Sequence, residues 1–187
     1  MDELTRAALR ARAGDDQALE EFVELAYEQV WRFCASLGDR QATEDLVQEV
    51  FVRAVRALPR FRADASARTW LLAIARHACM DDLRSRTRRR REAGTLAAGT
   101  PRDELVAADA AEHAALADLV RRLEPERRAA FVLTQVLGLS YDEAAEVCGC
   151  PLGTIRSRVA RARVELLELL DGRARVPRRA RREGWSS

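Results

Sequence analysis

The chain has 187 residues, which is long enough for one medium-sized domain or two small ones. Its 32 Lys and Arg nearly balance its 30 Asp and Glu, but the balance hides a local asymmetry. Arginine fills six of the eight positions 84–91 and six of the ten positions 173–182. Two such clusters can contact phosphates, although a pair of solvated basic segments would show the same pattern.

The cysteines and the apolar runs exclude two further classes of protein. The four cysteines lie within apolar helical pattern rather than in the dense framework of a small secreted domain, so we expect reduced thiols. No apolar run approaches the roughly 20 residues of a membrane span, and the acidic start Met1-Asp2-Glu3 is not a signal peptide, so we expect a cytoplasmic protein. Cys148 and Cys150, taken with His77 and Cys79, match no familiar metal-binding spacing, so we expect no metal and no cofactor.

The N-terminal part of the chain predicts three helices. Residues 15–37 carry one apolar stripe, and Gly38 follows as a C-terminal cap. A second helix covers residues 41–58, where the next residue, a proline, stops it. A third follows Asp64 as its N-cap and continues into the arginine cluster. Because no sustained period-two alternation occurs, the predicted fold class is all-α, and these helices can bury one core.

Small residues with glycine, threonine and proline fill the segment 93–110, a composition typical of a flexible linker. We therefore expect two small helical domains with few contacts between them. The expected boundaries are 1–92 for the first domain, 93–110 for the linker, 111–172 for the second domain and 173–187 for a basic tail.

The second domain contains the signature of a helix-turn-helix. Two helices are expected first, over residues 111–123 and 125–137. Ser140 and Glu143 then form a capping box that starts a short helix. Gly149 suits the left-handed conformation of a sharp turn, and Pro151 suits the entry into a further helix. This order of signals predicts a helix-turn-helix.

The helix after this turn has two distinct faces. Its apolar residues recur at helical spacing and should be buried: Ile155, Val159, Ala162, Leu166 and Leu169. Thr154, Arg158 and Arg161 share another face, with Ser157 nearby. Because arginine can pair with guanine or phosphate, we interpret this face as one that binds duplex DNA. The alternative is an ordinary surface helix rich in arginine and glutamate.

Three motifs, in this order along the chain, carry a resemblance. They are Glu44-Asp45-Leu46-Val47-Gln48-Glu49-Val50-Phe51, then Phe61-Arg62 with the stretch from Arg68 to Arg76 and with Asp81 and Leu83, and then Gly138 to Ala145 with Gly153 to Arg163. All three resemble parts of bacterial RNA polymerase sigma factors of the extracytoplasmic function (ECF) group. The first motif resembles the region 2 helix that docks on polymerase, and the second resembles the stretch that meets the minus-10 element. The third motif resembles region 4. The resemblance covers residues 8–170.

The resemblance implies three sets of site residues. Docking on core polymerase is assigned to Asp45, Gln48, Glu49, Val52 and Arg53, which helical spacing also places together opposite the apolar stripe. The minus-10 element is assigned to Phe61, Arg62, Asp64, Ser66, Arg76, His77 and Arg84. The minus-35 element is assigned to Thr154, Arg156, Ser157, Arg158 and Arg161.

Some of these assignments have alternatives. The docking face could be an ordinary solvated face. His77 occupies a position where many members carry asparagine, and it either donates to DNA or completes a helix face. Trp70 lies in a largely apolar helix and fits the core better than a DNA contact, although the loop before it could hold an unstacked base.

The resemblance implies a sigma factor that directs RNA polymerase core to specific promoters and initiates transcription, without catalytic residues of its own. Its implied partners are RNA polymerase core, promoter DNA and an anti-sigma factor. The alternative is a dimeric helix-turn-helix repressor or activator, which would need a ligand pocket or a dimer helix where this chain has the region 2 pattern. A soluble enzyme would need a catalytic constellation that the sequence does not offer.

Overall fold

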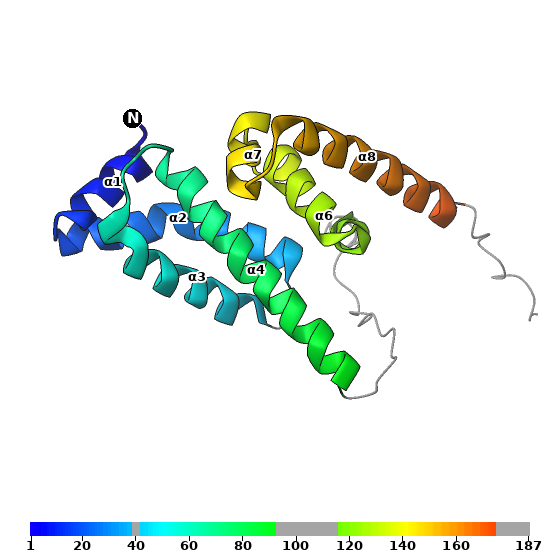
Figure 1. The fold of residues 1–187 in the computed structure, drawn as a ribbon, viewed down its shortest axis with the longest axis horizontal. Coiled ribbons are helices and arrows are strands. Elements are labelled where there is room, and N and C mark those ends of the chain that lie inside the picture. Colours follow the sequence, from blue (N-terminus) through cyan, green and yellow to red (C-terminus); the bar gives the residue numbers. More distant parts are fainter. Residues whose placement is uncertain (39–41, 93–115, 175–187) are drawn as a thin grey trace, which may run out of the picture.

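The computed structural model describes residues 1–38, 42–92 and 116–174. Within these ranges the regular structure is entirely helical, which confirms the all-α fold class (Figure 1). The linker expected at 93–110 lies outside the described residues, as do residues 111–115 and 175–187. Among the described helices, none combines the length and the apolar character that crossing a membrane requires.

The first helix, α1 (Glu3–Arg12), was missed by the sequence analysis. The acidic start, weighed above only against a signal peptide, is an N-cap: Asp2 Oδ1 accepts a hydrogen bond from the Thr5 amide at 2.9 Å. Leu4, Ala7 and Ala8 are buried against the rest of the N-terminal half. The Thr5 hydroxyl oxygen also accepts from the Ala67 amide at 2.9 Å, which ties α1 to the start of α4 (Ala67–Glu92).

Helices α2 (Asp16–Leu37) and α3 (Thr43–Ala57) follow the expected spans closely. Gly38 ends α2, but its backbone is extended, with φ −84° and ψ −173°, rather than left-handed. A Cβ at Gly38 would lie 3.0 Å from the Cys34 carbonyl oxygen and 3.2 Å from Leu46. The glycine is therefore needed for the close approach of α3 to the end of α2, not for a left-handed cap.

The expected N-cap of α4 is wrong by two residues. Ser66, not Asp64, caps this helix, because the Ser66 hydroxyl oxygen accepts from the Thr69 amide at 3.1 Å. Between α3 and α4 lies a 3₁₀ turn, η2 (Leu58–Arg60), and Ala63 in the following loop has a positive φ of 59°. A 3₁₀ turn and a loop with one left-handed residue therefore connect α3 to α4, whereas the sequence analysis expected only that a proline would end the helix.

The C-terminal half contains a helix over residues 116–122 and then α6 (Pro125–Phe131), which continues as the π-helical turn η3 (Val132–Val136). The predicted capping box then starts α7 (Tyr141–Cys148). Gly149 adopts the predicted left-handed conformation, with φ 59° and ψ 41°, before α8 (Leu152–Ala174). The helix-turn-helix is therefore confirmed, and the π-turn was not anticipated.

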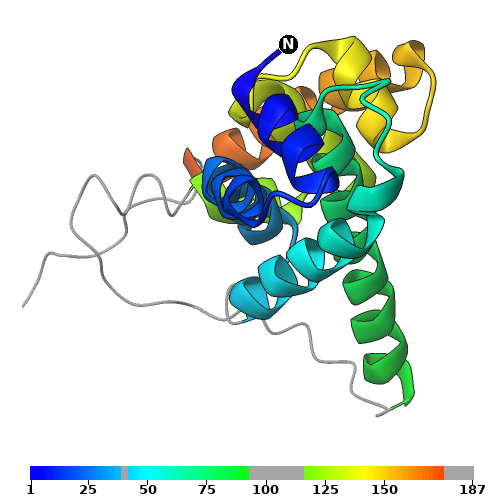
Figure 2. The same cartoon turned by 90° about the vertical axis from the view of Figure 1, so that its left-hand side faces the viewer.

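The two halves pack against one another, which differs from the expectation of few contacts between them. α7 lies against α4, while α6 and η3 lie against α2 (Figures 1 and 2). Buried apolar residues of both halves form one continuous cluster. Because this packing depends on residues far apart in the sequence, no local periodicity could have revealed it.

Candidate nucleic-acid interface

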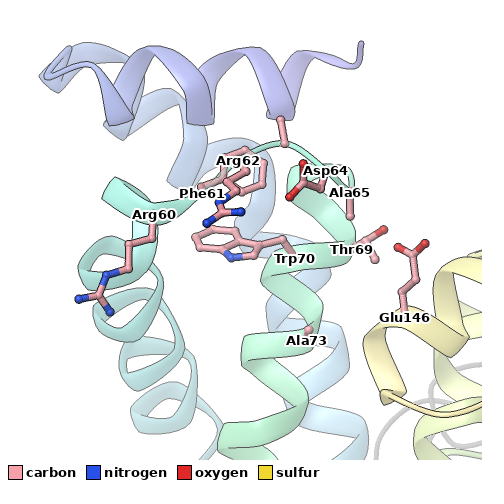
Figure 3. A pocket seen from close by; sticks show the side chains of 10 residues that line it. Arg60, Phe61, Arg62, Asp64, Ala65, Thr69, Trp70, Ala73 and Glu146 are labelled. Atoms are coloured by element: carbon pink, nitrogen blue, oxygen red, sulfur yellow. The ribbon is translucent and has the colours of Figure 1, made fainter.

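A pocket of about 340 Å³ opens at the loop between η2 and α4 (Figure 3). Residues 60–65 form one side, Thr69, Trp70 and Ala73 of α4 form the floor, and Glu146 of α7 faces it from the other half. The Phe61 ring is buried, with 3% of its surface exposed, and its centre lies 4.9 Å from that of Trp70. Phe61 therefore supports the Trp70 ring instead of offering its own ring to DNA.

Trp70 packs on the core, as expected, and also leaves part of its ring accessible. Its ring contacts the buried Phe22, at 6.5 Å between ring centres, yet it is only half-buried and lines the pocket. Arg62 and Asp64 are exposed at the rim, whereas the Ser66 hydroxyl is used as the cap of α4. An aromatic floor below a charged rim is an arrangement that can hold an unstacked base by stacking and hydrogen bonds.

The remaining minus-10 candidates do not share one surface. His77 is exposed, and its Nδ1 donates to the Ala73 carbonyl oxygen at 2.8 Å. Arg84 is exposed and lies 3.4 Å from Asp81. Arg76 is turned the other way: only 12% of its side chain is exposed, and it faces α6.

The minus-35 candidates on α8 also fall into exposed residues and residues that are partly buried. Arg156, Ser157 and Arg161 are exposed, and the Ser157 hydroxyl donates to the Thr154 carbonyl oxygen at 2.9 Å. Thr154 is half-buried. Arg158, with 23% of its side chain exposed, is held by Glu126 at 3.1 Å. Three of the five predicted residues thus form an open face at the start of α8, and Arg158 lies outside that face.

The sequence analysis overlooked Glu126 and Glu146. Glu126 binds both Arg76 and Arg158, and Glu146 faces the pocket. An acidic residue just after Pro125 lies in the first turn of a helix, where the helix dipole stabilises negative charge. Its position in the sequence therefore did not indicate a second role as a partner of arginines. Only the packing of α6 against α4 and α8 brings the two arginines to it.

The predicted docking face lies on α3. Asp45, Gln48 and Glu49 are exposed, and Val52 has 44% of its surface exposed. Arg53 is half-buried; it pairs with Glu49 at 2.7 Å and reaches Asp81 of α4 at 3.3 Å. The structure therefore brings these residues together as one polar surface with an apolar member. Within the described residues, no cluster of three or more His, Cys, Asp or Glu side chains is placed to hold a metal ion.

Comparison with known proteins assigns these features to a family. Residues 22–89 match the family model for sigma-70 region 2, and residues 113–166 match that for sigma-70, region 4. The ECF RNA polymerase sigma factor SigC of Mycobacterium tuberculosis is 47% identical over 165 residues, which are 88% of this chain and 89% of that protein. The chain belongs to the ECF sigma factors. It is a factor that directs RNA polymerase to promoters and initiates transcription.

Solved structures of sigma factors share the fold. A structure of CnrH in complex with the cytosolic domain of CnrY has a TM-score of 0.72 and 28% identity, and the match covers 91% of this chain and 99% of that one. The sigma factor RpoE from Bartonella quintana, solved with the anti-sigma factor NepR, has a TM-score of 0.68 and 29% identity, with coverages of 81% and 96%. The region 2 match of this sigma factor spans most of α2, all of α3 and most of α4, and the region 4 match includes α6, α7 and much of α8.

Proposed function

We propose that this sigma factor holds the minus-10 element in the pocket between η2 and α4. The observation that carries the proposal is the combination of the Trp70 floor, the Phe61 support behind it and the exposed Arg62 and Asp64 at the rim. A flipped base stacks on an aromatic surface, and charged groups around it can contact the sugar, the phosphate or the base edge. The Arg12 guanidinium donates to the Phe61 carbonyl oxygen at 2.6 Å, which holds the loop in this shape.

The minus-35 element is proposed to lie against the N-terminal part of α8. Arg156, Ser157 and Arg161 are exposed there, where the second helix of a helix-turn-helix enters the major groove. Thr154 and Arg158 belong to the same proposed interface. Arg158 can join it only after it leaves Glu126.

The α3 face is proposed to bind RNA polymerase core, with Asp45, Gln48, Glu49, Val52 and Arg53 at the contact. We extend to this chain the partner seen with the RpoE relative and propose that an anti-sigma factor also binds it. The protein is proposed to act in the cytoplasm, as an initiation factor without a reaction of its own. Residues 1–92 and 111–172 are the proposed functional domains, joined by 93–110 and followed by the basic segment 173–187.

Charge reversal on α3 tests the docking proposal. Asp45→Lys combined with Glu49→Lys should weaken binding to core polymerase about tenfold, because both carboxylates are exposed at the contact and the Glu49 pair with Arg53 is lost. The matched control reverses Glu20 and Glu24, which are also exposed and four residues apart but lie on α2. Binding of labelled protein to purified core polymerase measures the change.

An unchanged core affinity in the Asp45/Glu49 variant would remove α3 from the docking role. Absence of core binding by the unmodified protein, together with a stable dimer in solution, would instead support the dimeric helix-turn-helix regulator. If the effect is local to α3, the Glu20/Glu24 control variant should bind core polymerase as tightly as the unmodified chain.

A further inference from the structure

Helix α1 holds both ends of the loop that forms the proposed minus-10 pocket. The loop comprises residues 61–66 and connects η2 to α4. At its start, the Arg12 guanidinium donates to the Phe61 carbonyl oxygen at 2.6 Å. Directly after its end, the Ala67 amide donates to the Thr5 hydroxyl oxygen at 2.9 Å. Because α1 also packs against η2 and α4, one helix fixes the loop at two points (Figure 3).

The contact at the start of the loop is a charge-assisted hydrogen bond. Among the described residues, Arg12 has no carboxylate partner, and its guanidinium is directed to a backbone carbonyl oxygen. Hydrogen bonds from a charged donor are roughly twice as strong as neutral ones. The Phe61 ring lies 4.9 Å from that of Trp70, between ring centres. Arg12 therefore acts on the pocket through the backbone of Phe61, the residue that supports the aromatic floor.

The contact at the end of the loop satisfies an amide that α4 cannot satisfy by itself. The first amides of a helix have no partner within the helix, and that of Ala67 finds one in Thr5. Thr5 is buried, and its hydroxyl donates to Asp2 Oδ2 at 2.7 Å, so the N-cap of α1 fixes it in turn. Since Trp70 lies close to the start of α4, Thr5 also fixes where the aromatic floor begins.

The loop between these two points has a backbone conformation that needs support. Ala63 has a left-handed backbone, with φ 59°, which brings its Cβ close to the following carbonyl oxygen. Residues in such conformations persist where the surrounding structure holds them, and they are frequent at ligand-binding sites. Ala63 lines the pocket between Arg62 and Asp64 of the rim. Loss of either fixed end should allow the loop to relax, which would move the rim relative to the floor.

We propose that Arg12 and Thr5 are positioning residues that set the selectivity of the pocket for the base it holds. Neither side chain lines the pocket; Arg12 acts through the Phe61 carbonyl and Thr5 through the Ala67 amide. Both residues lie outside 22–89, the part of the chain that matches sigma-70 region 2. This inference rests on the proposed function, since it requires that the pocket binds a minus-10 base.

Selectivity between bases separates positioning from a general structural role. Stacking on Trp70 depends little on which base is bound, because every base has a π-face. Discrimination depends on hydrogen bonds from the rim to the base edge, and these weaken steeply when their geometry changes. A displaced rim should therefore bind the four bases with more similar strength. A general loss of stability would instead weaken binding of all four bases alike and leave the ratio between them unchanged.

Selections with reconstituted holoenzyme test the positioning role. The probe is a single-stranded nontemplate oligonucleotide whose minus-10 element is randomised. Arg12→Met and Thr5→Val each remove one contact to the loop, the first with loss of a charge and the second without it. At the position held in the pocket, both variants should lower the enrichment of the preferred base over the next one about fivefold, the effect of one lost hydrogen bond. Their affinity for core polymerase should equal that of the unmodified chain.

Two matched variants serve as controls. Arg6→Met removes the same charge from another exposed arginine of α1, which makes no side-chain hydrogen bond or ion pair within the described residues, so its enrichment ratio should not change. Thr5→Ser keeps the hydroxyl group and should restore the ratio that Thr5→Val loses. If circular dichroism shows that Thr5→Val has lost helix, Arg12→Met carries the test, because its side chain is exposed.

A fourth substitution keeps the inference and the proposed function apart. Trp70→Leu retains an apolar side chain but removes the aromatic surface, so it should reduce the preference at the position held in the pocket. Unchanged preferences at every position in Trp70→Leu would overturn the pocket itself. A reduced preference in Trp70→Leu, together with an unchanged ratio in Arg12→Met or equal losses in Arg12→Met and Arg6→Met, would leave the pocket in place and overturn the positioning role of α1.

Discussion

Two glycines on either side of Pro151 should respond in opposite directions to the same substitution. Gly149 has a left-handed backbone with φ 59°, and it ends α7 while the Cys150 amide donates to the Ala145 carbonyl oxygen at 3.1 Å. Gly153 lies within the first turn of α8. A Cβ added at either position meets no atom within 4 Å, so packing does not distinguish them. Backbone conformation alone should decide the outcome.

The magnitudes follow from the cost of each conformation. Gly149→Ala should lower the free energy of unfolding by about 1–2 kcal/mol, because a left-handed backbone brings Cβ close to the following carbonyl oxygen. Gly153→Ala should raise it by about 0.5–1 kcal/mol, because alanine loses less backbone entropy than glycine in a helix. Gly149→Asn should cost less than Gly149→Ala, since asparagine tolerates this conformation.

Urea unfolding of the full chain, followed by circular dichroism, measures both changes. With a slope of about 2 kcal/mol per molar urea, a change of about 1 kcal/mol moves the midpoint by roughly 0.5 M, in opposite directions for the two alanine variants. The slope itself should stay constant because neither methyl group alters the buried surface. Shifts of the same sign for Gly149→Ala and Gly153→Ala would refute the reasoning from backbone conformation.

Two further predictions concern the helix-turn-helix. Hydrogen bonds donated by Ser140 hold the pKa of Glu143 below its ordinary value of 4.5, so its stabilising effect is complete above about pH 4.5 and is lost as the pH falls through the lowered pKa. Glutamine at position 143 keeps the capping pattern but does not titrate. The free energy of unfolding of Glu143→Gln should therefore depend less on pH below pH 4.5 than that of the unmodified chain, and an equal pH dependence of the two proteins would contradict this prediction. Arg156→Ala combined with Arg161→Ala should change the bases that holoenzyme prefers in selections on randomised minus-35 duplexes. Arg163→Ala should not change them, because the Arg163 side chain donates to Gln135 at 2.7 Å. Identical base preferences in the unmodified protein, the double variant and Arg163→Ala would remove this face from base recognition.

Local chemistry was enough to predict much of the fold. The Ser140 and Glu143 side chains lie three residues apart, so the sequence alone specifies the capping box. Gly149 and the stripe that begins at Ile155 are equally local signals, and all three were confirmed, except that Leu169 at the end of the stripe is only half-buried. The first helix was missed although the Asp2 cap was visible, because leucine is the one large apolar residue among its four buried residues, the others being Thr5, Ala7 and Ala8.

Features that depend on long-range packing could not be predicted in this way. Ser66 and Asp64 are both competent caps, and the loop with its positive φ at Ala63 decides which of them meets the first amides of α4. The packing of α6 and α7 against α2 and α4 joins residues that are separated by tens of positions. The exposure of a candidate contact residue is set by that packing.

The arginines illustrate why a basic pattern alone does not define a DNA-binding surface. Arg156 and Arg158 are two residues apart on α8, yet the first is exposed and the second is held by Glu126. Arg76 follows the same rule on α4, because the same carboxylate binds it. An exposed arginine can meet a phosphate at once, whereas a paired one must first lose a charge-assisted bond. Exposed and paired arginines therefore differ in what a new contact costs: Arg156 breaks no ion pair of the described structure, whereas Arg76 and Arg158 would each have to give up the pair with Glu126.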